Sequence, residues 1–524
     1  MPTPGDGADS VADAAVAASP AAAGRERLSA RPSVSSRYLP VVPVTTGVHQ
    51  LQAESPDSRE TVTDVKIGYV GGGSQGWAHT LINDLVQCPD VSGRVALYDL
   101  DYEGAERNAD LGNEVAARDD VASDWTFEAH RDIDDALAGA DFVVCSIQDP
   151  PDETFVHDID VPAEYGIYQT VADTVGPGGT FRAMRAVPQY REIAATVREQ
   201  CPDAWVVNYT NPMTVCTRTL YAEYPDINAI GLCHEVFGTQ RFLAGLVEKY
   251  VDDAEDVGAE EIDLNVKGVN HFTWVDEARW HGRDIFEFVD AELDARKPLP
   301  ADDPGDLAGE SYWSNDHQIA LDLYDRFGLL GAAGDRHLAE FVPWYLDIDD
   351  PAEIEQWGVR LTPSSARESD GEAPAKMSRH LNEDGTFELT ESGEEVVDIM
   401  RALLGLDPIK THVNYENVGQ CPDLKTGAVV ETNAVITGDS VTPLTAGELP
   451  PEVHTLVSRA VTNQETVVAA GMAGDLDKAF RAFLNDALVN IGREEARELF
   501  RELVEIERDY LTDYDLDEAD VLQA

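Results

Sequence analysis

Apolar residues between positions 64 and 255 occur in short continuous runs that alternate with longer segments of helical periodicity. The first run, Val65 to Val70, leads into a glycine-rich turn and then into a segment with an apolar stripe. Further runs of the same kind are RVALYDLD, GADFVVCSI, WVVNYTNP and INAIGLCHE, with helix-like segments such as GTFRAMRAVPQYREIAATVREQ between them. Strands that alternate with helices predict βαβ units and therefore a parallel sheet.

The pattern changes after about residue 255. The segment IDLNVKGVNHFTWVDEARWHGRDIFEFV alternates as strands do, helical stretches follow around residues 313–330, and residues 451–511 predict long helices. We therefore predict an α/β fold, with a Rossmann-type parallel-sheet domain over residues 64–255 and a mixed α+β domain over residues 256–524. Residues 1–63, rich in Ala, Ser, Pro, Gly and Asp, predict a disordered tail.

The charge balance narrows the range of partners. The chain has 99 acidic and 38 basic residues, a formal net charge of −61. Nucleic acid and anionic membranes are poor partners for such a chain, and the acidity along its whole length predicts adaptation to molar salt. Six widely spaced cysteines without a CxxC pair, no signal peptide and no bilayer-length apolar run predict a cytoplasmic protein without a membrane segment.

A dinucleotide site is predicted at the first strand-to-helix turn. The sequence GGGSQG satisfies G-x-G-x-x-G directly after a strand and at a helix start, where a pyrophosphate can approach the backbone. Asp99 ends the next strand about 23 residues later, where an acid would bind a ribose 2′-hydroxyl and favour NAD over NADP. The predicted cofactor-binding residues are Gly71, Gly73, Ser74, Gln75, Gly76 and Asp99.

A second candidate site involves a thiol and an imidazole. Cys233 follows the fifth predicted strand, and His271 ends another strand-like run about 38 residues later. A thiolate and a neutral imidazole can bind a divalent ion and leave positions open for substrate oxygens. One Cys and one distant His are more often core residues, so the spacing alone does not decide between a metal site and packing.

The motifs GGGSQG, LYDLD, DTVGPGG, NYTNP, GLCHEVFG, GVNHFTW, NYENVGQCPDL and GAVVE occur in this order over about residues 64–490, and their combination resembles glycoside hydrolase family 4. The resemblance implies NAD, a manganese or other divalent ion, and no pair of catalytic carboxylates. It implies oxidation at C3 of the sugar by NAD, elimination across C1 and C2, addition of water and return of the hydride.

The resemblance also assigns roles to individual residues. Cys233 and His271 match the metal ligands, and Asn211 matches an asparagine near the sugar hydroxyls. Asp173 occupies a position with a substrate or proton-handling role, for which helix capping is the alternative. Where sugar-phosphate members have a catalytic tyrosine, this chain has GDRHLAEFVPWY, so Asp335 is the first choice as catalytic base and His337 the second.

The tetrapeptide CHEV, residues 233–236, resembles the variant associated with α-galacturonidases. His234 in this motif implies an unphosphorylated sugar and is a candidate substrate contact. A uronate also needs a cation, for which Arg182, Arg185 and Arg336 are candidates. Glu235 would repel such a substrate unless it points away, is protonated or orients His234.

Several alternatives remain open at this level. An α-glucuronidase or α-galactosidase of the same family is the nearest alternative to an α-galacturonidase. A 2-hydroxy acid dehydrogenase of the lactate/malate type would share the overall fold but would not need Cys233 with His271. A nucleotide-binding regulatory protein without catalysis is a third alternative. The resemblance further implies a homo-oligomer, either a dimer or a tetramer, acting on a small-molecule glycoside.

Overall fold

The computed structural model describes residues 63–74, 76–148, 152–300, 315–363, 380–382 and 385–523. The predicted tail, except Thr63, and Gln75 of the glycine-rich turn lie outside the described residues. From Glu60 to Ala524 the chain forms one compact unit. Within the described residues, no helix is both long enough and apolar enough to cross a membrane.

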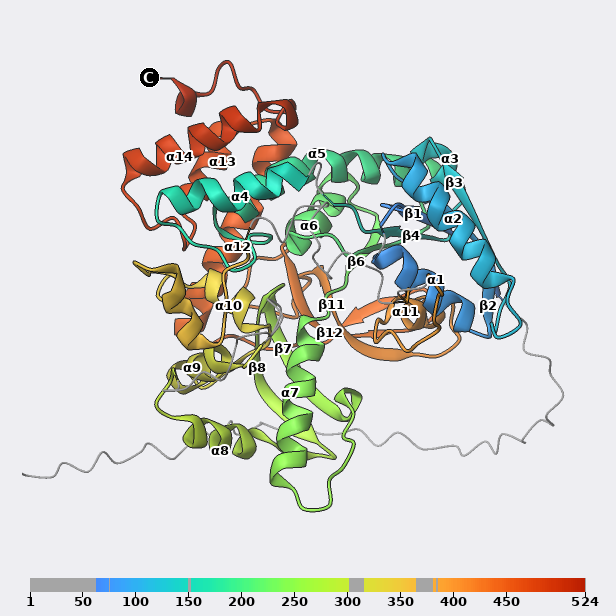
Figure 1. The fold of residues 1–524 in the computed structure, drawn as a ribbon, viewed down its shortest axis with the longest axis horizontal. Helices are drawn as coiled ribbons and strands as arrows, with labels where there is room; N and C mark the ends of the chain where they lie inside the picture. Colours follow the sequence, from blue (N-terminus) through green and yellow to red (C-terminus); the bar gives the residue numbers. More distant parts are fainter. Residues whose placement is uncertain are drawn as a thin grey trace, which may run out of the picture. The chain divides into compact units, whose positions relative to one another are not determined.

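Among the described residues, nine strands form one large sheet in the order β13-β12-β11-β6-β5-β4-β1-β2-β3 (Figure 1). Six of them are mutually parallel, which confirms the predicted Rossmann-type sheet, and three antiparallel strands from the second half of the chain extend it beyond β6. The parallel strands are β1 (Thr63–Val70), β2 (Val91–Tyr98), β3 (Trp125–His130), β4 (Phe142–Cys145), β5 (Trp205–Asn208) and β6 (Asn228–Gly231); the antiparallel strands are β11 (Ile409–Glu416), β12 (Val429–Ile436) and β13 (Val441–Pro443).

Helices cover both faces of this sheet, as the apolar strand runs require. In β4, Phe142 and Val144 pack in the core with α1, α2 and α11, whereas Val143 and Cys145 pack in the core with α3, α5 and α6. The helices in this part of the unit are α1 (Trp77–Gln87), α2 (Tyr102–Ala116), α3 (Ile133–Leu137), α4 (Asp152–Glu164), α5 (Gly176–Gln200), α6 (Met213–Glu223), α7 (Glu235–Tyr250) and α11 (Val396–Leu403).

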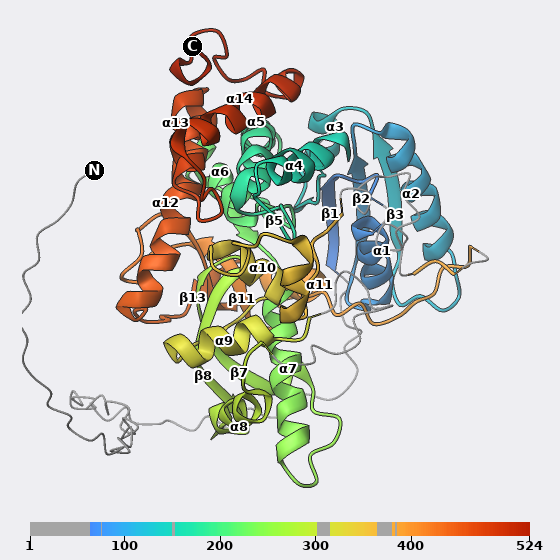
Figure 2. The same cartoon turned by 60° about the vertical axis from the view of Figure 1, so that its left-hand side comes forward.

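A smaller antiparallel sheet has the order β10-β8-β7, with β9 beside β8, and carries α8, α9 and α10 nearby (Figure 2). The expected long helices at the end of the chain are present, and they pack on α4 and α5 of the first half (Figure 1). The large sheet thus takes strands from both sides of the predicted boundary near residue 255, whose position stays a prediction. The elements are β7 (Ile262–Val269), β8 (Phe272–Trp280), β9 (Arg283–Asp284), β10 (Leu330–Gly331), α8 (Phe286–Arg296), α9 (Gln318–Phe327), α10 (Asp335–Phe341), α12 (Pro451–Ala473), α13 (Leu476–Leu484) and α14 (Arg493–Ile506), with short 3-10 turns at Ala259–Glu261, Pro351–Trp357, Arg508–Tyr510 and Asp520–Leu522.

A buried ion cluster joins α5 to the C-terminal region. Arg185 of α5 binds Asp158 of α4, with Nη2 and Oδ2 2.7 Å apart, and also binds Glu507 just after α14. All three side chains are at most 1% exposed. Removing the guanidinium would leave two buried carboxylates without a cation, which is strongly unfavourable.

We expect Arg185→Leu to lower the free energy of unfolding by about 3–5 kcal/mol for this reason. Denaturant unfolding followed by tryptophan fluorescence measures the change. The matched control is Arg283→Leu, which removes a surface pair with Glu287 and should cost less than about 1 kcal/mol. Equal effects of the two substitutions would contradict the assigned role of the buried cluster.

Candidate active site

The predicted site residues gather at the edge of the large sheet where its parallel strands end. The glycine-rich turn follows β1, Asn211 lies three residues after β5, and Cys233 lies two residues after β6. In an open α/β sheet this edge is where ligands bind.

The first three residues of the turn after β1, Gly71 to Gly73, leave no room for a side chain. Gly71 has φ +97°, and a Cβ there would lie 2.3 Å from the Ser146 carbonyl oxygen. The backbone N–H of Gly73 donates to Asp99 Oδ2 at 2.8 Å, so the acid at the end of β2 contacts the turn directly. Ser74 Oγ accepts from the N–H of Trp77 at the start of α1, whose first turn contains no acidic residue. The turn therefore offers backbone groups and an uncompensated helix start, which suit a dinucleotide pyrophosphate.

Cys233 and His271 meet at this edge. His271 lies in the two-residue turn between β7 and β8 with φ +64°, an uncommon conformation for a residue with a side chain. Its Nε2 lies 3.3 Å from Cys233 Sγ, and both residues are buried. The two residues that sequence spacing could not pair are thus in direct contact.

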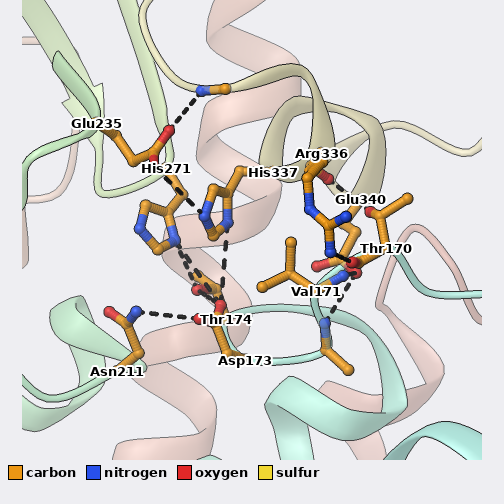
Figure 3. Close-up of polar contacts among 12 residues, drawn as sticks. Thr170, Val171, Asp173, Thr174, Asn211, Glu235, His271, Arg336, His337 and Glu340 are labelled. Atoms are coloured by element: carbon orange, nitrogen blue, oxygen red, sulfur yellow. Dashed lines mark hydrogen bonds and ion pairs between the residues drawn. The ribbon is translucent and has the colours of Figure 1, made fainter. Parts of the chain in front are cut away.

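The tautomer of His271 follows from its other nitrogen. Thr174 Oγ1 donates its single proton to Asp173 Oδ1 at 2.7 Å, and the same oxygen lies 2.8 Å from His271 Nδ1 (Figure 3). Because a hydroxyl has one proton, Thr174 must accept from Nδ1–H, which leaves the lone pair on Nε2 facing Cys233. Burial lowers the pKa of His271 to about 3, so the ring is neutral at physiological pH.

Burial raises the pKa of the Cys233 thiol well above its usual value, and the nearby carboxylates of Glu431 and Glu235 act in the same direction. The thiolate therefore needs a cation close by. A divalent ion held by Cys233 and His271 would supply that cation, and the Thr174 hydroxyl would orient the imidazole in the way that partners of metal-binding histidines do. The donor set fits a thiophilic divalent metal.

A second possible ligand set shares His271. Ligand atoms of Asp173, His271 and His337 all lie within 4.8 Å of one another. The atom of His271 that lies near Asp173 in that set is Nδ1, at 3.9 Å from Oδ1. Nδ1 carries the proton that it donates to Thr174, so it has no free lone pair for a metal ion. The geometry therefore favours Cys233 and His271 as the metal ligands.

Asn211 and Asp173 lie beside this pair. Asn211 Nδ2 donates to Asp173 Oδ2 at 3.1 Å. The other amide atom, Asn211 Oδ1, is buried without a hydrogen-bond partner among the described residues. A buried acceptor without a donor is unfavourable, so this oxygen is suited to a ligand hydroxyl.

His337 of α10 faces the same cluster. Its ring stacks on that of His271 with centroids 3.6 Å apart, Nδ1 lies 3.9 Å from Asp173 Oδ1, and Nε2 lies 3.8 Å from Glu235 Oε1 (Figure 3). Glu235 also accepts from the N–H of Gly334 at 2.6 Å, and its Oε1 lies 3.5 Å from His234 Nε2. Glu235 therefore connects the CHEV turn to the start of α10, while His234 is about half exposed.

Asp335, two residues before His337, points elsewhere. Its Oδ1 accepts from the N–H of Ala320 in the first turn of α9 at 2.9 Å. Burial raises its pKa to about 7, although backbone N–H groups of α9 act against this shift. The structure thus brings His337 to the cluster and engages Asp335 at the beginning of another helix.

Arg336 and Glu340 of α10 fix the loop that precedes Asp173. The Arg336 guanidinium donates to the Thr170 carbonyl, the Thr362 hydroxyl and the Arg360 carbonyl. Glu340 Oε1 accepts from the N–H groups of Val171 and Ala172, at 2.7 and 3.0 Å (Figure 3). These bonds favour an anchoring role for Arg336 rather than the predicted substrate contact.

Comparison with known proteins identifies the family. The family model described as family 4 glycosyl hydrolase matches residues 66–249, and that of its C-terminal domain matches residues 266–489. An alpha-galacturonidase of Thermoanaerobacterium saccharolyticum is 44% identical, covering 86% of this chain and 97% of its own length. The chain belongs to glycosyl hydrolase family 4. An alpha-galacturonidase of Bacillus subtilis is 43% identical over 85% of this family 4 chain and 98% of its own length.

Solved structures agree with the fold. The crystal structure of the Bacillus subtilis lplD protein has a TM-score of 0.76 and 42% identity, covering 84% of this family 4 enzyme and 100% of that chain. A 6-phospho-alpha-glucosidase from gut microorganisms, solved in complex with NAD and Mn²⁺, has a TM-score of 0.66 at 18% identity and covers 86% and 99% of the two chains. Family membership makes the protein a glycosidase rather than a 2-hydroxy acid dehydrogenase.

Residues without a predicted role complete the site of this family 4 enzyme. Glu431 lies near Cys233, accepts from the side-chain amides of Asn414 at 3.1 Å and Asn270 at 3.4 Å, and has a pKa that burial raises to about 8. Asn414 and Glu431 belong to the motifs NYENVG and GAVVE, but the family resemblance assigns no role to these two side chains. Glu340 had no signal in the sequence beyond its place three residues before Pro343.

We expect Cys233→Ser to abolish tight Mn²⁺ binding and Thr174→Val to weaken it by about 10- to 100-fold, because the valine cannot hold the His271 tautomer. His337→Gln is the matched control and should retain the metal. Titration of Mn²⁺ followed by electron paramagnetic resonance measures all three variants. Loss of Mn²⁺ in His337→Gln with retention in Cys233→Ser would instead assign the ion to Asp173, His271 and His337.

Proposed function

We propose that this family 4 glycosidase cleaves α-galacturonides. The observation that carries the proposal is the contact between Cys233 Sγ and His271 Nε2, with His337 and Asn211 beside it and the dinucleotide turn at the same sheet edge. Relatives named alpha-galacturonidase at 43–44% identity support the choice of sugar. An α-glucuronidase or α-galactosidase activity is the alternative.

We assign NAD to the turn at Gly71, Gly73, Ser74, Gly76 and Asp99, and a divalent ion to Cys233 and His271. The predicted contribution of Gln75 lies outside the described residues. A family relative of known structure is in complex with NAD and Mn²⁺, and the residues present here fit both groups. The chemistry that these groups supply when bound is reversible hydride transfer at C3 of the sugar and polarisation of the adjacent oxygens.

The side chains around the metal site then handle the sugar and its protons. Asn211 Oδ1, a buried acceptor, receives a sugar hydroxyl. His337 removes the proton from C2, and the C1 substituent leaves with its bonding electrons; water then adds at C1 and the proton returns to C2. Asp173 accepts hydrogen bonds from Thr174 and Asn211. It thereby orients the Asn211 amide directly and His271 through Thr174.

A cytoplasmic location, an adaptation to high salt and assembly as a dimer or tetramer belong to the same proposal. All six cysteines are free, which suits a reducing compartment. The net charge of −61 supports the adaptation to high salt, because salt screens the self-repulsion of so many negative charges. An unfolding midpoint that does not change with salt concentration would rule out the adaptation to high salt.

The first test is release of p-nitrophenol from α-D-galacturonide by reduced protein in molar salt with NAD and Mn²⁺, beside the α-glucuronide and the α-galactoside. We expect turnover of the galacturonide, lost without NAD and in Cys233→Ser. In D₂O the released galacturonate should carry deuterium at C2, because the C2 proton exchanges with solvent while it is on the base. Turnover of another glycoside alone would replace the proposed sugar; binding of NAD without any turnover would favour a regulatory protein.

The second test concerns the base. His337→Gln should lower kcat by about 10²- to 10⁴-fold and should suppress deuterium incorporation at C2, while NAD and Mn²⁺ still bind. Asp335→Asn keeps an acceptor for the Ala320 N–H and should retain most of the activity. The opposite result, an inactive Asp335→Asn with an active His337→Gln, would restore Asp335 as the base.

A further inference from the structure

Three arginines could neutralise a uronate carboxylate by sequence alone, and the structure separates them. Arg185 binds the buried carboxylates of Asp158 and Glu507. Arg336 donates to two carbonyls and a hydroxyl. Both guanidinium groups therefore already bind groups of the protein itself. Arg182 is the remaining candidate for binding the carboxylate of the sugar.

Arg182 lies on the same helix pair as Arg185 but meets a different neighbour. On α4, Phe155 and Asp158 are three residues apart, as Arg182 and Arg185 are on α5, so the two helices face each other along matching stripes. Arg185 meets the acid, whereas the guanidinium of Arg182 lies over the Phe155 ring, with Cζ 4.3 Å from its centroid. A ring orients the guanidinium plane without neutralising it.

The remaining contact of Arg182 ties it to the sugar site. Its Nε donates to the backbone oxygen of Asn211 at 2.9 Å, and Asn211 in turn donates to Asp173 at 3.1 Å. The residue is 8% exposed, and its two terminal nitrogens have no hydrogen-bond or ion-pair partner among the described residues. These terminal nitrogens are also absent from the buried polar atoms without a partner, so they stay open to an anionic ligand while the rest of the side chain is held in place.

We propose that Arg182 binds the carboxylate of the sugar and thereby makes the site selective for uronides over neutral sugars; this inference rests on the proposed function. The carboxylate of a hexuronate is attached to C5, across the ring from C2 and C3. Asn211 and the Cys233–His271 pair receive the C2–C3 side, and Arg182, which contacts the Asn211 backbone oxygen, offers its two terminal NH₂ groups as a fork for the carboxylate.

Binding of free sugars tests the proposal without catalysis. Calorimetric titration of D-galacturonate and of D-galactose into the protein with NAD and Mn²⁺ compares the wild type with Arg182→Gln, Arg182→Lys and a control. Arg182→Gln keeps a donor for the Asn211 carbonyl but removes the charge and the fork. Arg182→Lys keeps the charge alone. Arg241→Gln, an exposed arginine of α7, controls for the loss of one positive charge from an acidic chain.

We expect Arg182→Gln to weaken galacturonate binding by roughly 30-fold or more with galactose binding unchanged, Arg182→Lys to fall between, and Arg241→Gln to match the wild type. Equal losses for both sugars in Arg182→Gln would overturn the proposal and make Arg182 a brace for the Asn211 loop. Retained preference for galacturonate in Arg182→Gln would place the carboxylate elsewhere and overturn the inference alone. A wild type that binds galactose as well as galacturonate would overturn both the inference and the proposed substrate.

Discussion

The hydrogen bond between Thr174 and His271 is the interaction on which the rest of the site depends. Thr174 has one hydroxyl proton and donates it to Asp173, so the imidazole must be the donor in the second bond. That single assignment places a lone pair on Nε2, opposite a buried thiol. His271 has a left-handed backbone conformation, which costs of order 1–3 kcal/mol, and the pairing of β7 with β8 on either side of it holds the residue there.

Helix α10 aligns the parts of the site that come from distant segments. Arg336 and Glu340 hold the loop before Asp173, and Gly334 at its start binds Glu235 of the CHEV turn. This also resolves the apparent conflict between an acidic site and an anionic sugar. Glu235 is turned toward α10, and burial raises the pKa of Glu340 to about 7 and that of Glu431 to about 8, so these two groups carry less than a full negative charge near neutral pH.

The sequence predicted the parallel sheet because its buried strands are continuous apolar runs, and it missed β3 because an edge strand such as WTFEAH exposes alternate residues. The family motifs pointed to Cys233, His271 and Asn211. The sequence ranked Asp335 before His337 as the base, whereas the structure turns His337 toward His271 and Asp335 toward α9. Residues two apart on a helix point about 200° apart, so only one of the two could face the cluster. The motifs could not show which of the three arginines binds a carboxylate of the sugar. The partner of each arginine is set by tertiary contacts, such as that between Arg185 and Glu507.

Recognition and catalysis share one rigid element. Helix α5 begins just after Asp173 and Thr174 and carries Arg182 before the end of its second turn and Arg185 within the third. Because Arg185 is locked between Asp158 and Glu507 in the core, α5 cannot shift against α4 without separating buried charges. The distance between the groups that fix the metal-site tautomer and the cation proposed for the carboxylate is therefore set by the helix itself. A change of sugar in this framework is therefore easier by replacing a side chain that contacts the sugar than by moving the loop, because moving the loop would also displace Thr174 from His271.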